Sequence, residues 1–169
     1  MPTLLRRDLQ ALAAVGGAAA IGAILGLPTG TRALLAQGAL LPLIILAVAL
    51  VCSPALFIGA GLLGAKPGIA DVCHAVGQGA LASGHALLGF VPVALFLTAT
   101  RATGRHPAVA VIGLLVVAVV AGSLRTWHVL GAKGEGNKRL LPYFVCWSGA
   151  SLTLGGLLLF HAFRIGGVL

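Results

Sequence analysis

The chain has 169 residues, of which 59% are hydrophobic and only 8% are charged, and its formal net charge is +8. A water-soluble domain keeps about a quarter of its residues charged, so this composition excludes a soluble globular domain and indicates a surface that faces lipid. The basic residues lie singly or in pairs at the ends of apolar runs. That placement indicates contacts with lipid headgroups and excludes a nucleic-acid-binding surface. The three cysteines lie in apolar segments, and an odd number of such thiols does not make a disulfide framework.

The first apolar run, residues 11–27, follows a short segment that carries Arg6 and Arg7. This arrangement has the outline of a signal peptide. No small-x-small cleavage site follows the run, so we interpret it as the first transmembrane helix. Gly22 and Gly26 are four residues apart on one face of this helix, which favours close approach of a second helix.

A short connection leads to the second apolar run, residues 39–65. Pro54 lies inside this run and predicts a kink, because proline removes one backbone hydrogen bond from a helix. Ser53, the residue before it, can return a hydrogen bond to the freed carbonyl groups. The turn at residues 66–68 is short, so the second and third spans are expected to form an antiparallel hairpin.

The third run, residues 69–100, carries four polar side chains in an otherwise apolar sequence. At about 100° per residue they fall within an arc of about 60° on one helix face. Lipid would leave them without partners, so we expect this polar stripe to face inward, toward protein, water or a ligand. The helix would be about 48 Å long against a hydrocarbon core of ~30 Å, so it must tilt, project or kink near Pro92. The polar stripe consists of Asp71, His74, Gln78 and His85.

The fourth and fifth apolar runs are residues 107–128 and 140–166. Arg125 and His128 end the fourth run in the manner of a membrane interface, and His161 lies near the end of the fifth. These three residues are the candidate partners of the polar stripe on other helices.

Five runs predict an all-α fold, a polytopic transmembrane helical bundle that forms one integral membrane domain over residues 1–169. The termini of such a bundle lie on opposite sides of the membrane. With the N-terminus inside, seven basic residues lie on the cytoplasmic side and four outside, so the positive-inside rule predicts N-in/C-out. The cytoplasmic seven are Arg6, Arg7, Lys66, Arg125, Lys133, Lys138 and Arg139, and the outer four are Arg32, Arg101, Arg105 and Arg164.

The run LLPLIILAVALVCSPALF, residues 40–57, is followed by a glycine-bearing helix end and resembles a set of bacterial five-span membrane proteins. In that set a lysine or small residue, Pro and Leu lead into an apolar run that ends in Cys-x-Pro-x-Leu. FVPVALFLTAT (residues 90–100) and LPYFVCWSGASLTLGG (residues 141–156) fall where the set has its "PV-aromatic-T" end and its last span. The set is similar in outline to the Yip-domain membrane proteins, although this chain lacks the aromatic and Arg-Pro residues near their C-terminus. The resemblance implies five helices and no settled activity, and we expect a multi-pass protein of the bacterial inner membrane.

Three functions are compatible with these features. Polar side chains in membrane bundles often form interhelical hydrogen bonds worth about 0.6 kcal/mol each, and short loops leave mainly lipid-facing surface for recognition. This favours a non-enzymatic structural or assembly subunit whose partner is another membrane protein or a second copy. The second function is proton or ion transport along the polar stripe, although only one carboxylate lies near a span and no internal repeat is detected.

The third function is a redox subunit that binds haem b through axial imidazoles. His74 and His85 lie about 16 Å apart along one helix, so each would need His128 or His161 as its partner, and matched histidine pairs on two helices are absent. No His-Glu-x-x-His cluster exists, and Ser148 lies in a Trp-Ser-Gly sequence too short to indicate a serine nucleophile. We therefore expect no metal site and no enzymatic activity.

Overall fold

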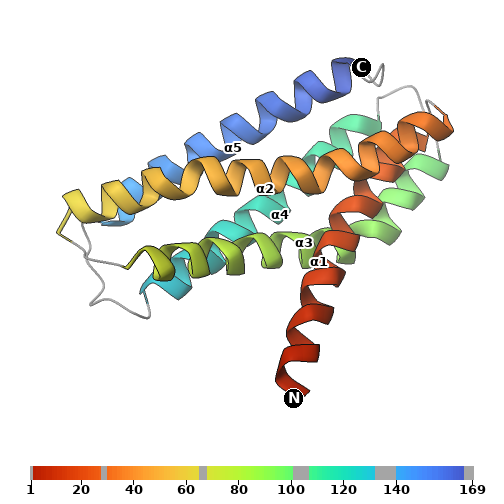
Figure 1. Ribbon diagram of the computed structural model, residues 1–169. Helices are drawn as coiled ribbons and strands as arrows, with labels where there is room; N and C mark the ends of the chain where they lie inside the picture. The colour runs from red at the N-terminus through yellow and green to blue at the C-terminus, as the bar shows by residue number, and fades with distance from the viewer. Residues whose placement is uncertain (1, 28–29, 65–67, 101–106, 132–139, 166–169) are drawn as a thin grey trace.

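The computed structural model describes residues 2–27, 30–64, 68–100, 107–131 and 140–165, and these residues form five long α-helices without strands (Figure 1). Each helix contains a stretch that is long and apolar enough to cross a membrane. Large apolar side chains such as Leu50 and Leu62 lie exposed on the outer surface, as in a multi-pass membrane protein. The prediction of an all-α bundle of about five spans is confirmed. The helices are α1 (Pro2–Gly26), α2 (Thr31–Leu62), α3 (Ile69–Ala99), α4 (Pro107–Gly131) and α5 (Leu140–Ile165).

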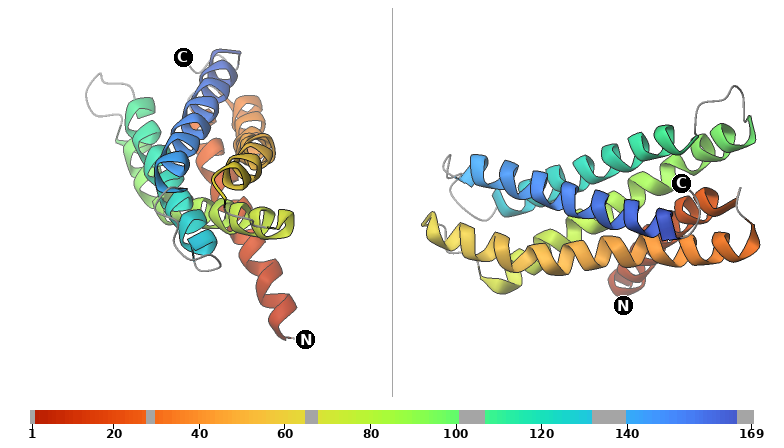
Figure 2. Two further views of the ribbon diagram at one scale, coloured as in Figure 1. Left: turned by 90° about the vertical axis from the view of Figure 1, so that its left-hand side faces the viewer. Right: turned by 90° about the horizontal axis from the view of Figure 1, so that it is seen from above.

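The helices form two antiparallel pairs with α1 laid across one side (Figures 1 and 2). α3 packs along α4, and α5 packs along α2. The C-terminal half of α1 contacts both α2 and α3, while its N-terminal part projects away from the other four helices. The loops at residues 101–106 and 132–139, and with them the basic residues and Glu135 that the sequence places there, lie outside the described residues.

α2 begins at Thr31, so the segment predicted to be a short connection before residue 39 is helical. Gly30 adopts a φ of 112°, which glycine tolerates and which lets the chain reverse between α1 and α2. Beyond that reversal Gln37 is buried against α1, and its carbonyl oxygen lies where a Cβ on Gly22 would be. In the same way, the Ala33 carbonyl oxygen lies where a Cβ on Gly26 would be. Packing against α1 therefore explains why residues 31–38 are helical.

Small residues set the contact between α3 and α4. A Cβ on Gly79 would collide with Thr126 Oγ1, and a Cβ on Gly122 would collide with Ser83 Oγ. Each helix has two small residues four positions apart, Gly79 and Ser83 on α3 and Gly122 and Thr126 on α4. Each helix therefore has a ridge of small residues that faces the other helix. Two helix backbones can approach this closely only because neither glycine carries a side chain.

Side chains of α5 donate hydrogen bonds to the backbone of α2. Tyr143 Oη donates to the Ala55 carbonyl at 2.5 Å, and Trp147 Nε1 donates to the Cys52 carbonyl at 2.8 Å. These two carbonyl groups lie on either side of Pro54, where α2 continues as one helix. Ser53 Oγ donates to the Ala49 carbonyl at 2.5 Å, whereas the carbonyl that Pro54 leaves without its helical donor is that of Leu50. α3 likewise continues as one helix through Pro92.

The buried apolar side chains form two clusters at opposite ends of the bundle. An aromatic cluster joins Phe144 to Trp127 and Trp147, with ring centroids 5.1 and 5.4 Å apart. It also contains Leu56, Val72 and Val76. An aliphatic cluster occupies the other end and contains Ala18, Ile21, Ile24, Leu25, Leu41, Leu87, Ala94, Leu115 and Ala118, with Ile45 and Leu159 packed against it.

Candidate functional site

The two histidines of the polar stripe lie on the outer face of α3, so the prediction that the stripe faces the interior is wrong for His74 and His85. His74 and His85 are exposed, and Asp71 and Gln78 are half-buried. The buried face of α3 is the one that carries its small residues, because only those residues permit the close contacts with α4 and α1. The polar side chains suggested that this face points inward. The face that other helices cover is instead the one whose small residues let two backbones come close together.

Two members of the stripe are bonded within their own helix. Asp71 Oδ2 accepts a hydrogen bond from the Gly68 backbone N–H at 3.2 Å and so caps the start of α3. His85 Nδ1 lies 2.8 Å from the Leu81 carbonyl oxygen, which requires Nδ1 to carry the proton. In the neutral ring Nε2 is then an acceptor, and it lies on an exposed side chain.

A crevice of about 610 Å³ between α1, α2 and α3 adjoins the stripe. His74 and Gln78 belong to its wall, and most of the remaining wall is apolar. A close contact between α1 and α3 forms one edge of the crevice. There a Cβ on Gly84 would lie 2.7 Å from the Cβ of Ala14, and α1 diverges from the bundle toward its N-terminus (Figure 1). The other residues of its wall are Val15, Ala18, Pro42, Leu43, Ile45, Leu46, Cys73, Gly77, Ala80 and Leu81.

The candidate partners on other helices do not meet the stripe. Arg125, His128 and His161 are all exposed on α4 and α5, whereas α4 covers the small-residue face of α3. Among the described residues no three His, Cys, Asp or Glu side chains are grouped closely enough to hold a metal ion. With its histidines directed outward, this part of the chain has no interior imidazole pair of the kind that axial ligation of haem requires.

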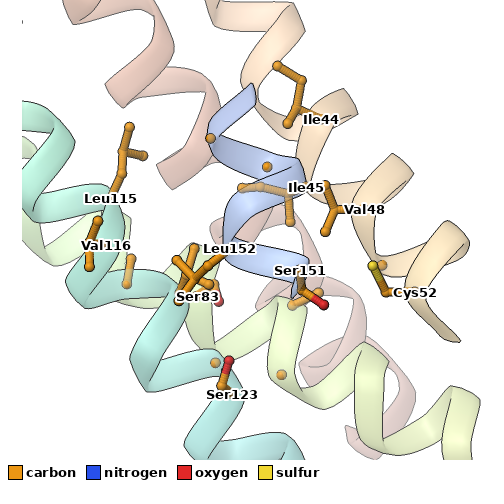
Figure 3. Close-up of a pocket in the computed structure, with 18 of the residues that line it drawn as sticks. Ile44, Ile45, Val48, Cys52, Ser83, Leu115, Val116, Ser123, Ser151 and Leu152 are labelled. Carbon is orange, nitrogen blue, oxygen red and sulfur yellow. The ribbon is translucent and has the colours of Figure 1, made fainter. Parts of the chain in front are cut away.

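A second hollow lies inside the bundle, and the sequence did not indicate it. It has a volume of about 340 Å³ and is lined by residues of α2, α3, α4 and α5 (Figure 3). Most of its wall is apolar, and none of its residues is charged. The small polar groups in the wall come from all four helices, so no single stretch of sequence shows them together. They are Cys52, Ser83, Ser123, Thr126, Ser151 and the indole of Trp147.

Ser148 follows Trp147 in the sequence but is not part of the wall of this hollow. Its hydroxyl oxygen is buried and has no hydrogen-bond partner in the described segments. A serine nucleophile at Ser148 would need a histidine such as His85 or His128, and both are exposed on α3 and α4. A serine nucleophile needs a base within hydrogen-bond reach, and the structure shows no such contact for Ser148.

Comparison of the chain with protein-family models, with curated proteins and with solved structures gave no match. The resemblance to bacterial five-span proteins therefore stays a prediction.

Proposed function

We propose that this protein is a non-enzymatic subunit of a membrane complex and that it binds a membrane-protein partner, or a second copy of itself, through the outer face of α3. One observation carries the proposal. The two histidines of the polar stripe, His74 and His85, lie on a surface that the protein's own helices leave exposed.

The position of His85 makes this surface costly in lipid. His85 lies close to the middle of α3, which runs from Ile69 to Ala99, so in a spanning helix it lies near mid-depth. The imidazole is too short to reach the headgroups from there, in contrast to a long lysine or arginine side chain. A hydrogen-bonding atom left unpaired in hydrocarbon costs several kcal/mol. A partner that pairs Nε2 removes this cost, which gives the complex a driving force that the isolated chain lacks.

The crevice beside the stripe supports a helix as the partner element. Its wall is apolar apart from His74, Gln78 and the thiol of Cys73, so an apolar helix that carries one or two hydrogen-bonding side chains matches it. Interhelical hydrogen bonds of this kind contribute about 0.6 kcal/mol each, and apolar packing in the crevice adds to them. Together with the resemblance noted above, these features favour a place in a complex of the bacterial inner membrane.

The test is site-specific photo-crosslinking in native membranes. A benzophenone side chain at Phe96, which is 66% exposed on the stripe face of α3, should crosslink to one protein in defined stoichiometry. The matched control places the same group at Leu157 of α5, which is 59% exposed, and should give no specific crosslink. Two differently tagged copies of the chain distinguish a second copy from another partner.

The replacements His85→Leu and Gln78→Leu should reduce the crosslink at Phe96 and leave the helical content of the protein unchanged. Recovery of monomer alone in mild detergent, together with equal and nonspecific crosslinking at Phe96 and Leu157, would contradict the proposal.

A further inference from the structure

The interior hollow has a polar end and an apolar end. Near the aromatic cluster its wall includes Cys52, Thr126 and Trp147. Near the aliphatic cluster its wall consists of hydrocarbon side chains, among them Leu41 and Leu115. Ser83, Ser123 and Ser151 lie between the two ends (Figure 3). A ligand that matches this wall has one small polar group and one apolar chain.

The hydroxyl groups in the wall can bond a ligand without losing their present partners. Thr126 Oγ1 donates to the Gly122 carbonyl at 3.0 Å, and Ser151 Oγ donates to the Trp147 carbonyl at 2.9 Å. A hydroxyl that donates its proton in this way keeps lone pairs free to accept a hydrogen bond. These oxygens can therefore accept from a ligand that carries its own donor, such as an alcohol.

The hollow is open to the surrounding lipid between α4 and α5. α5 is held mainly by α2, and its contact with α4 is slight. Val116 and Phe160 belong to the wall of the hollow yet are 44% and 53% exposed, so they mark the opening. Gly156 lies at the same opening without a side chain to obstruct it. A chain from the bilayer can enter here without passing through water.

A ligand in this hollow would make dispersion contacts of the kind found in a packed interior. Its volume of about 340 Å³ lies within the range of about 300–1,000 Å³ that is usual for small-ligand sites. No charged residue is present to pair with a phosphate or a carboxylate, and an unpaired charge is costly in such surroundings. The wall therefore selects against the ionic headgroups of most bilayer lipids.

We propose that the hollow binds a single-chain lipid with an uncharged hydroxyl head, a long-chain alcohol, with its head among the serine and threonine hydroxyls and its chain toward Leu41 and Leu115. This site is separate from the outer face of α3, so it does not rest on the proposed assembly function.

The experiment uses the full chain in phosphatidylcholine nanodiscs and a photoreactive probe, hexadecanol with a diazirine at the end of its chain. Labelling should be saturable, should be displaced by unmodified hexadecanol and should map to aliphatic-end residues such as Leu41, Leu115 and Leu159. The same chain with a carboxylate head should label at least about tenfold less, which corresponds to about 1.4 kcal/mol of binding free energy.

Gly155→Leu is the blocking variant, because a Cβ at Gly155 meets only Val48 at 3.8 Å and the rest of the side chain then fills the hollow. It should lower saturable labelling at least about tenfold. Gly149→Leu is the matched control on the same helix, since a Cβ there meets nothing within 4 Å and Gly149 is not part of the wall. It should label like the unaltered protein.

Equal labelling of the Gly155→Leu and Gly149→Leu proteins, or equal labelling by the alcohol and the carboxylate probes, overturns the proposal. Displacement of the probe by hexadecanol is measured on the unaltered protein, so the test does not depend on either variant folding. Label spread over the outer faces of α2 and α5, without saturation, overturns it as well.

Discussion

Gly79 of α3 and Gly122 of α4 lie so close together that a Cβ on either would fall within 3 Å of the other's carbonyl oxygen, at 2.8 and 2.7 Å. This contact fixes how α3 is rotated in the bundle. At about 100° per residue, Gly79 lies about 140° from His74 and about 120° from His85 around the helix. Placing the glycine against α4 therefore directs both histidines away from it.

The first prediction concerns this contact. Gly122→Ala should destabilise the folded protein by about 1–3 kcal/mol, because the new methyl group collides with the Gly79 carbonyl oxygen and the helices must separate. Gly113→Ala, on the same helix but with nothing within 4 Å of the new Cβ, should be neutral or stabilising by up to about 1 kcal/mol. Reversible unfolding in mixed micelles measures both changes. Equal stability of the two variants would show that the close contact is unimportant.

The number and class of the helices could be predicted from the sequence, since each apolar run is long enough to span a bilayer as a helix and a helix satisfies its backbone hydrogen bonds within one segment. The first turns of α2 could not be predicted, because Thr31 and Arg32 are residues typical of a loop. Only the structure shows that Gln37, in the next turns, is buried against α1. Helical spacing alone predicted which four residues share one face of α3. Helical spacing could not predict the direction in which that face points, because the direction depends on which glycines of other helices lie against Gly79 and Gly84.

The interior hollow illustrates the same limit. Ser83, Ser123 and Ser151 each occur in a different helix, and a serine in an apolar run usually bonds its own backbone. Only the packing of four helices brings the three residues to one space. A sequence pattern within one helix contains no information about that arrangement.

The second prediction concerns the attachment of α5 to α2. Trp147→Phe removes the hydrogen bond to the Cys52 carbonyl and should cost about 0.6 kcal/mol, with an upper bound near 1.7 kcal/mol. It should also speed the reaction of the half-buried Cys52 with a membrane-permeant maleimide, since the indole no longer holds α5 there. The rate is measured with Cys73 and Cys146, the two exposed thiols, replaced by serine. An unchanged rate would mean that the Trp147 hydrogen bond is not needed to hold α5 in place.

The third prediction concerns orientation. The count of basic residues favours the N-terminus in the cytoplasm and the C-terminus outside. Alkaline phosphatase fused to the C-terminus should be active, and green fluorescent protein fused there should be dark, because each reporter matures on one side of the membrane only. The same pair fused at the N-terminus is the control and should give the opposite pattern. A fluorescent C-terminal fusion would reverse the assignment.

The last prediction separates the two nitrogens of His85. Nδ1 is bonded to the Leu81 carbonyl at 2.8 Å, so the proposed partner must pair with Nε2. Glutamine places its amide at about the position of Nε2, whereas asparagine places its amide at about that of Nδ1. His85→Gln should therefore retain most of the crosslink at Phe96, and His85→Asn should lose it, although both variants keep a neutral hydrogen-bonding group. Quantification of the crosslinked fraction at equal expression gives the result. If asparagine preserved the crosslink as well as glutamine does, the histidine would act through its own helix and the partner would bind α3 by apolar contact alone.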